Sequence, residues 1–141
     1  MMKTWKHFTI NELIESETAN KLKIKNIPDN DIKENLNLLV ENVLDPLREW
    51  CGCPIRVCSG YRCEELNRMV GGVKNSQHLK GEAADIQPIG IKFDVFVYKI
   101  KKWCANNIFD QCIIEKSDKS KWVHISYSRT KNRRQLFNLN L

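Results

Sequence analysis

The longest regular pattern of apolar positions follows Asp29. Apolar residues recur there at spacings of three and four, which is typical of the buried face of an amphipathic helix: Ile32, Leu36, Leu39, Val40, Val43, Leu44 and Leu47. Asp29 or Asn30 is the expected N-cap, and Pro46 is a position where the helix can kink. We expect this helix to be the main helix of the core.

The strand candidates combine alternating apolar positions with β-branched residues. They are residues 55–59, 83–86, 111–115 and 122–126. Because only the polar turn 116–121 separates the last two, we expect them to form an antiparallel hairpin.

Three shorter helices are expected within residues 1–28, at residues 63–70 before Gly71-Gly72, and through residues 95–103. In the first, Thr9 is the candidate N-cap and Glu12 follows three residues later, as in a capping box. Residues 21–28 are expected to form a loop. These elements predict an α+β fold, with helices packed on a small, mainly antiparallel sheet.

The 141 residues are 42% hydrophobic, which is enough apolar material for one core. No internal repeat or linker divides them, so we expect a single domain spanning residues 1–141, with residues 1–28 as an N-terminal extension packed on the core. No uncharged apolar run approaches the length that spans a bilayer. The initial stretch MMKTWKHFTINEL lacks an apolar h-region, so ordinary secretory export is not expected.

The chain carries a formal net charge of +6 and six cysteines. The lysines are scattered, and the densest basic stretch, residues 129–134, has no interleaved aromatic residues, so we expect no specific nucleic-acid partner. A polyanionic cell wall would attract the same charge equally well.

The six cysteines lack the paired C-x-x-C spacing of zinc sites, and the chain shows no signal peptide that would favour disulfides. We therefore expect the cysteines to be mostly reduced and to form neither a zinc site nor a disulfide framework.

A metal site is one interpretation of the segment from Ser76 to Asp85. On one continuous helix His78 and Asp85 would be about 10 Å apart along the axis, but Gly81 between them permits a turn that brings both to one centre. A catalytic zinc commonly takes three protein ligands, so a further imidazole must come from His7 or His124. On the residues alone, surface or hydrogen-bonded histidines remain the more frequent alternative.

Several motifs in order resemble one family. Ser76, His78, Gly81, Ala83 and Asp85 occupy the pattern Ser-x-His-x-x-Gly-x-Ala-x-Asp, which lies between the motif Ser59-Gly60-Tyr61-Arg62 with Asn67 upstream and Trp122-Val123-His124 downstream. From about Phe8 to Arg134 the chain resembles the zinc D-Ala-D-Ala carboxypeptidases (peptidase M15), in particular the short versions encoded by bacteriophages and prophages.

The resemblance implies the fold shared with the signalling domain of hedgehog proteins, and a zinc ion (Zn2+) held by His78, Asp85 and His124. It implies a hydrolase that cuts an amide bond in bacterial peptidoglycan stem peptides, as a carboxypeptidase or an endopeptidase, with a phage endolysin as one form. Such an enzyme would reside in the cytoplasm before release and act at the cell wall. The alternative is a non-catalytic wall-binding or virion structural module that keeps the zinc site and assembles with a virion or tail partner.

The general base is the point where the chain departs from the family, which often has an acidic residue three positions before the last histidine. Lys121 stands there. If the hairpin pairs Glu115 with Trp122, Glu115 lies on the metal-facing side, diagonally from His124. The hypothesis is therefore that Glu115 is the base, and the alternative is a surface carboxylate at a strand end. Asp118 and Glu82 are weaker candidates.

Three further residues are candidates for substrate binding. By the resemblance Arg62 lies at the active site, where its guanidinium suits a terminal carboxylate or a developing oxyanion; a surface ion pair is the alternative. Ser76 can bind substrate or cap the ligand loop. Trp122 can contact substrate or form part of the core or pocket wall.

Overall fold

The computed structural model describes residues 5–141. Residues 1–4, which belong to the stretch where no signal peptide is predicted, lie outside the described residues. The helices are α1 (Ile10–Ile14), α2 (Glu17–Leu22), α3 (Asn30–Leu39), the π turn η1 (Val40–Leu44), α4 (Asp45–Cys51), α5 (Glu64–Met69), the 3-10 turn η2 (Gln77–Lys80) and α6 (Phe93–Asn106). The strands are β1 (Ile55–Ser59), β2 (Ala83–Pro88), β3 (Gln111–Lys116), β4 (Lys121–Ser126) and β5 (Gln135–Asn140).

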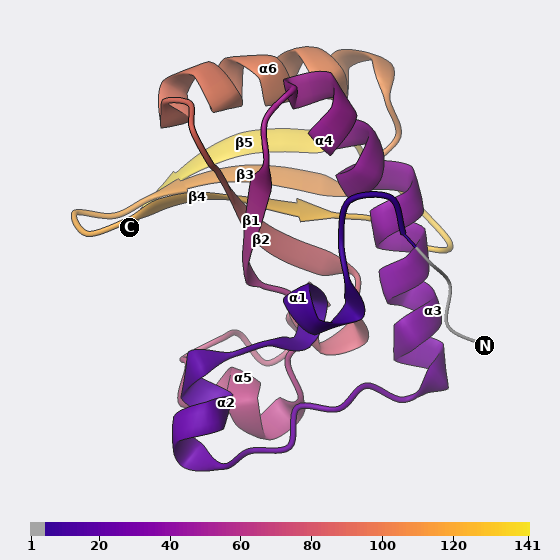
Figure 1. Cartoon of the computed structure of the whole chain (residues 1–141), viewed down its shortest axis with the longest axis vertical. Helices are drawn as coiled ribbons and strands as arrows, with labels where there is room; N and C mark the ends of the chain where they lie inside the picture. Colours follow the sequence, from indigo (N-terminus) through magenta and orange to yellow (C-terminus); the bar gives the residue numbers. More distant parts are fainter. Residues whose placement is uncertain (1–4) are drawn as a thin grey trace.

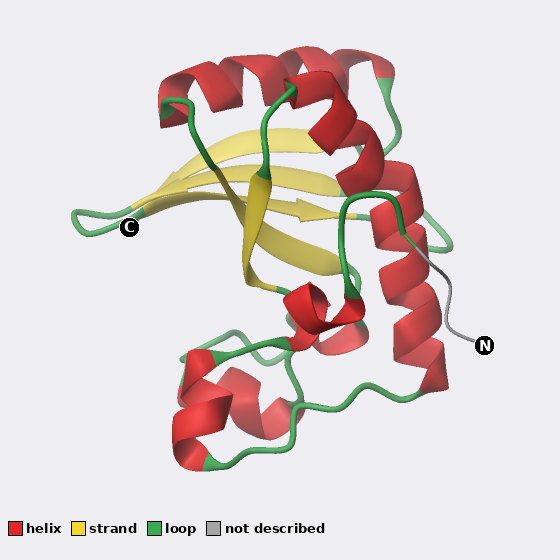
Figure 2. Ribbon diagram, viewed as in Figure 1, coloured by secondary structure: helices red, strands yellow, loops and turns green. Residues whose placement is uncertain are grey.

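The strands form one sheet (Figure 2). Their order in the sheet is β1-β2-β4-β3-β5. The pairs β1/β2, β2/β4 and β3/β4 are antiparallel, and β5 pairs with β3 in parallel. The α+β class and the mainly antiparallel sheet are thus confirmed. Strand β5 is not among the strands expected from the sequence.

The predicted hairpin is present, and its register meets the condition of the Glu115 hypothesis: Glu115 is opposite Trp122, and Ile113 is opposite His124. Alternation along β4 places Val123 and Ile125 in the core, both fully buried, and His124 on the opposite face. The sheet therefore has one apolar face and one face available for polar side chains.

Helices cover the apolar face of the sheet. Figure 1 shows α6 running along one end of the molecule, and α3, η1 and α4 forming one continuous helical column along a side. Their buried residues join those of β2, β3 and β4 in one core cluster. The column is the predicted main helix, with Asp29 as its N-cap. Its irregularity is a π turn that immediately precedes α4, where the missing N–H of Pro46 is tolerated in the first turn.

The N-terminal segment contains two helices where one was predicted. Thr9 caps α1 as expected, and its side chain accepts a hydrogen bond from the Glu12 N–H. Ser16 caps α2 in the same way, and Lys23 ends α2 in the left-handed conformation. The predicted loop at residues 21–28 therefore begins only at Lys23.

Phe8 and Leu13 are buried in the core cluster, so the N-terminal segment packs against the rest of the fold. Trp50 is 54% exposed, and its indole N–H donates to the carbonyl of Lys99. The cysteines form no disulfide, and Cys58 is the exposed one. No helix within residues 5–141 is long and apolar enough to cross a membrane.

The burial of Ile125 on the apolar face of the sheet predicts that shortening its side chain will destabilise the fold. Ile125 lies fully buried on the central strand β4, whereas Leu139 on β5 is 40% exposed. Ile125→Ala should lower the free energy of unfolding by about 2–5 kcal/mol, and Leu139→Ala by about 0.5 kcal/mol or less. Urea titrations of both variants measure the difference, and equal losses would contradict the assignment of the core face.

Candidate metal centre

The turn η2 places His78 over the sheet. Ser76 is its N-cap, and the Ser76 hydroxyl oxygen accepts from the His78 N–H at 3.2 Å. Gly81 ends the turn with φ +71°, and a side chain there would also collide with Ile32. A tight turn thus separates His78 from Asp85, as the glycine predicted, and Ser76 has the capping position.

A second close approach of the backbone orients the His78 ring. A Cβ on Gly60 would overlap the Leu13 carbonyl, so only glycine fits where the chain leaves β1. The Tyr61 N–H donates to that same Leu13 carbonyl at 2.7 Å. In this position the Gly60 carbonyl oxygen lies 2.7 Å from His78 Nδ1. Because a carbonyl only accepts, Nδ1 carries the ring proton and Nε2 is left with its lone pair.

Asp85 and His124 complete a cluster with His78. The two residues are directly opposite each other on β2 and β4. Asp85 Oδ1 lies 3.3 Å from His78 Nε2 and 3.2 Å from His124 Nδ1, and one potential ligand atom from each residue lies within 4.8 Å of the others. Ligands of a tetrahedral zinc with bonds of about 2.1 Å are roughly 3.4 Å apart, so the spacing suits that ion.

The donor atoms also fit a cation chemically. His124 Nε2 lies 2.8 Å from the Gln77 amide oxygen, which is an acceptor. The ring nitrogens that face away from Asp85, His78 Nδ1 and His124 Nε2, therefore both have acceptors for their protons. His78 Nε2, His124 Nδ1 and the Asp85 carboxylate then direct lone pairs toward the same point. Such an arrangement is favourable when positive charge lies between them, which a metal ion can supply.

The cluster is accessible from one side. The His78 side chain is 2% exposed, whereas those of Asp85 and His124 are 15% and 12% exposed. Burial alone would raise the pKa of Asp85, but the interaction with the two adjacent imidazole groups outweighs it and holds the pKa well below its usual range. The carboxylate is therefore ionised at neutral pH, as a metal ligand must be.

His7, the other candidate for the third imidazole, lies elsewhere. Its ring is 3.3 Å from a carboxylate oxygen of Glu49, and its backbone N–H donates to Asp45. The structure thus brings His124, and not His7, to His78 and Asp85.

Glu115 lies on the face of the sheet that carries the cluster. It is partly buried, and one carboxylate oxygen accepts from the Trp122 indole N–H at 2.8 Å. Burial is the main cause that raises the pKa of Glu115, and the nearby charge of Asp85 adds to it. Lys121 is exposed and alternates with Trp122 and His124 along β4, so its side chain does not share their face.

Arg62 lies at the wall of a groove of about 370 Å³ that also borders Asp85. The groove continues to residues 15–18 of the N-terminal segment. Arg62 is partly buried, and its Nε has no hydrogen-bond partner among the described residues. It forms no ion pair there, which disfavours the surface ion-pair interpretation. Burial lowers the pKa of Arg62, while the carboxylates of Asp85 and Glu115 counteract this.

Sequence reasoning missed the residues that support the ligands. Gln77 bonds His124, and Asp110 bonds Gln77. Gln77 occupies an unspecified position of the Ser-x-His pattern, and nothing in the local sequence marks Asp110. The only available signal was the adjacency of Gln77 to His78.

A comparison with protein families gives one match. The family model described as Peptidase M15 matches residues 6–126. That range covers α1 to β4 and contains all three residues of the cluster, and it ends before β5. No curated protein matches the chain.

The cluster predicts that zinc stabilises the folded chain through His124. At a free zinc concentration a hundred times the dissociation constant, binding should add about 2.7 kcal/mol to the free energy of unfolding. His124→Ala should lose this increment and His7→Ala should keep it, because only His124 belongs to the cluster. Denaturant titrations with and without zinc measure both. An increment that survives His124→Ala would contradict the assignment.

Proposed function

Because the chain belongs to the peptidase M15 family, we propose that it is a zinc metallopeptidase that hydrolyses an amide bond in peptidoglycan stem peptides. The observation that carries the proposal is the convergence of His78, Asp85 and His124 beside the partly buried Glu115. When bound, a zinc ion lowers the pKa of water and polarises a carbonyl group. His78, Asp85 and His124 would hold the ion.

Glu115 is proposed as the general base. Its raised pKa brings the carboxylate closer to the operating pH, which favours both taking a proton from water and passing it to the leaving amine. The hydrogen bond from the Trp122 indole fixes one carboxylate oxygen and leaves the other for this task. In this proposal the general base lies on β3, and not at the position of Lys121 on β4, where the family often has an acidic residue.

Arg62 is proposed to bind the substrate. Its guanidinium has an unpartnered N–H, and the groove beside it leads to Asp85. A terminal carboxylate satisfies a planar guanidinium in a bidentate manner. Trp122 is proposed to contact the peptide next to the metal. For Ser76, the hydrogen bond to the His78 N–H accounts for capping, and substrate binding is an additional role.

For the biological setting, we propose an endolysin of bacteriophage origin that is cytoplasmic before release and acts at the cell wall. The net charge of +6 supports attraction to an anionic wall. The second candidate is a wall-binding or virion-associated module that keeps zinc without hydrolysis. Lys121, in place of an acidic residue, is the observation that favours it.

Digestion of purified peptidoglycan by the zinc-loaded protein, followed by mass spectrometry, tests the proposal. New amino and carboxyl ends that need zinc, and that are absent with His78→Ala or a chelator, would identify a peptidase and its bond. Intact stem peptides after incubation with folded, zinc-bound protein would favour the wall-binding module.

Removing the proposed base should slow hydrolysis without removing the metal. Glu115→Gln keeps the size of the side chain and should lower kcat by about 100- to 10,000-fold, while zinc affinity stays close to that of the parent. Asp118→Asn is the matched control, because Asp118 is an exposed carboxylate in the hairpin turn. Unchanged kcat in Glu115→Gln would exclude Glu115 from the mechanism.

Arg62 should determine the preference for a free carboxyl end. If Arg62 binds a terminal carboxylate, Arg62→Ala should lower kcat/KM for a substrate with a free carboxyl end by about 10-fold or more, which is the loss expected for a charged hydrogen bond. An amidated substrate should react slowly with the parent and change little in the variant. An equal loss with both substrates would assign Arg62 to the oxyanion instead.

A further inference from the structure

Asp110 is a buried carboxylate outside the metal cluster. Asp110 is 4% exposed and lies immediately before β3. Arg133 holds both of its oxygens: Nε donates to Oδ1 at 2.8 Å, Nη2 donates to Oδ2 at 2.9 Å, and the Arg133 backbone N–H donates to Oδ1 at 3.0 Å. These bonds from Arg133 lower the pKa of Asp110. At neutral pH Asp110 is therefore ionised and can only accept hydrogen bonds.

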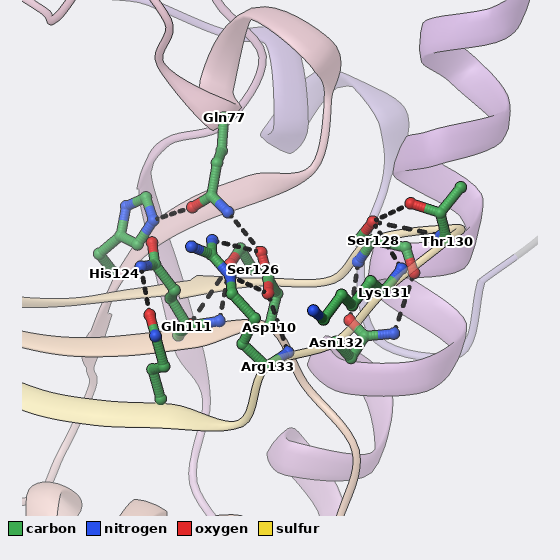
Figure 3. A network of polar contacts seen from close by, with 11 residues as sticks. Gln77, Asp110, Gln111, His124, Ser126, Ser128, Thr130, Lys131, Asn132 and Arg133 are labelled. Atoms are coloured by element: carbon green, nitrogen blue, oxygen red, sulfur yellow. Dashed lines mark hydrogen bonds and ion pairs between the residues drawn. The ribbon is translucent and has the colours of Figure 1, made fainter.

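Gln77 lies between this carboxylate and the metal cluster. Figure 3 shows its amide spanning the space from Asp110 to His124. One end lies 2.8 Å from Asp110 Oδ2 and the other 2.8 Å from His124 Nε2. Since Asp110 only accepts, the NH2 group must face Asp110, and the amide oxygen must face His124. The Asp110 carboxylate thus determines the orientation of the Gln77 amide.

The fixed amide in turn fixes the tautomer of His124. An amide oxygen only accepts, so His124 Nε2 must carry the ring proton. Nδ1 is then left unprotonated, and it is the nitrogen that lies 3.2 Å from Asp85 Oδ1. His78 has the opposite tautomer, because the Gly60 carbonyl holds the proton on Nδ1.

We propose that Gln77, Asp110 and Arg133 form a positioning relay that selects Nδ1 of His124 as the metal-binding nitrogen and holds the ring toward the metal. The proposal rests on the metal centre of the proposed function and names the residues that prepare it. A backbone carbonyl performs this task for His78, whereas side chains from three separate segments perform it for His124. The support of His124 is therefore the part of the site that substitutions can alter.

Zinc affinity tests the relay, because none of its members is in the metal cluster. Gln77→Met keeps the length of the side chain and removes both hydrogen bonds. Asp110→Asn offers an NH2 group where Gln77 needs an acceptor, so the Gln77 amide can rotate and favour the wrong tautomer of His124. Each variant should weaken zinc binding by about 10- to 100-fold, the effect typical of residues that hold a ligand.

Gln87→Met is the matched control. Gln87 lies on β2, and its amide donates to the backbone carbonyl of Lys121, not to a cluster residue. Competition with a chromophoric chelator should give this variant the affinity of the parent. Parent-like affinity in folded Gln77→Met and Asp110→Asn would overturn the proposal.

A second measurement does not depend on the variants. Long-range 1H–15N spectra of the zinc-loaded parent report which ring nitrogen of each histidine carries the proton. The proposal requires protonated Nε2 in His124 and protonated Nδ1 in His78; protonated Nδ1 in His124 would overturn it even if the variants failed to fold. Hydrolysis enters neither measurement, so a parent that binds zinc but cuts no stem peptide would contradict the proposed function alone.

Discussion

The antiparallel pairing of β2 with β4 is the constraint on which the candidate site depends, because it places Asp85 directly opposite His124. A shift of one residue in either strand would turn one of these side chains to the other face. The core prevents such a shift. Ala84 and Ile86 on β2, and Val123 and Ile125 on β4, are fully buried on the apolar face. The hydrophobic core therefore fixes the geometry of the polar face.

The position of His78, the third candidate ligand, depends on the backbone conformation at two glycines. Gly81 lets the turn that carries His78 return to the sheet, and Gly60 brings a carbonyl within 2.7 Å of the His78 ring. Both glycines lie where a side chain would collide with the N-terminal half of the chain, at Ile32 and Leu13. The N-terminal segment and the main helix thus contribute to the site without supplying a ligand. An arrangement of lone pairs held in this way is prepared for a cation before the cation binds.

Local pattern predicted the elements that build the site, because alternation and helical spacing report burial directly. It predicted the hairpin and allowed the turn at Gly81, whereas the register of the hairpin entered only as a condition of the Glu115 hypothesis. It did not predict β5, whose residues are all exposed and so carry no burial signal, or the π turn before Pro46. Local spacing also left His7 and His124 as alternatives, since only the tertiary fold brings β4 beside β2. Gln77 and Asp110 escaped prediction for the same reason: their contacts link segments 33 residues apart.

A crystal structure of the zinc-loaded protein, with diffraction data collected at the zinc absorption edge, tests the central claim most directly. The account predicts one strong anomalous peak about 2.0–2.2 Å from His78 Nε2, a carboxylate oxygen of Asp85 and His124 Nδ1. A peak at His7 or at the cysteines instead, or bonding through His124 Nε2, would contradict it.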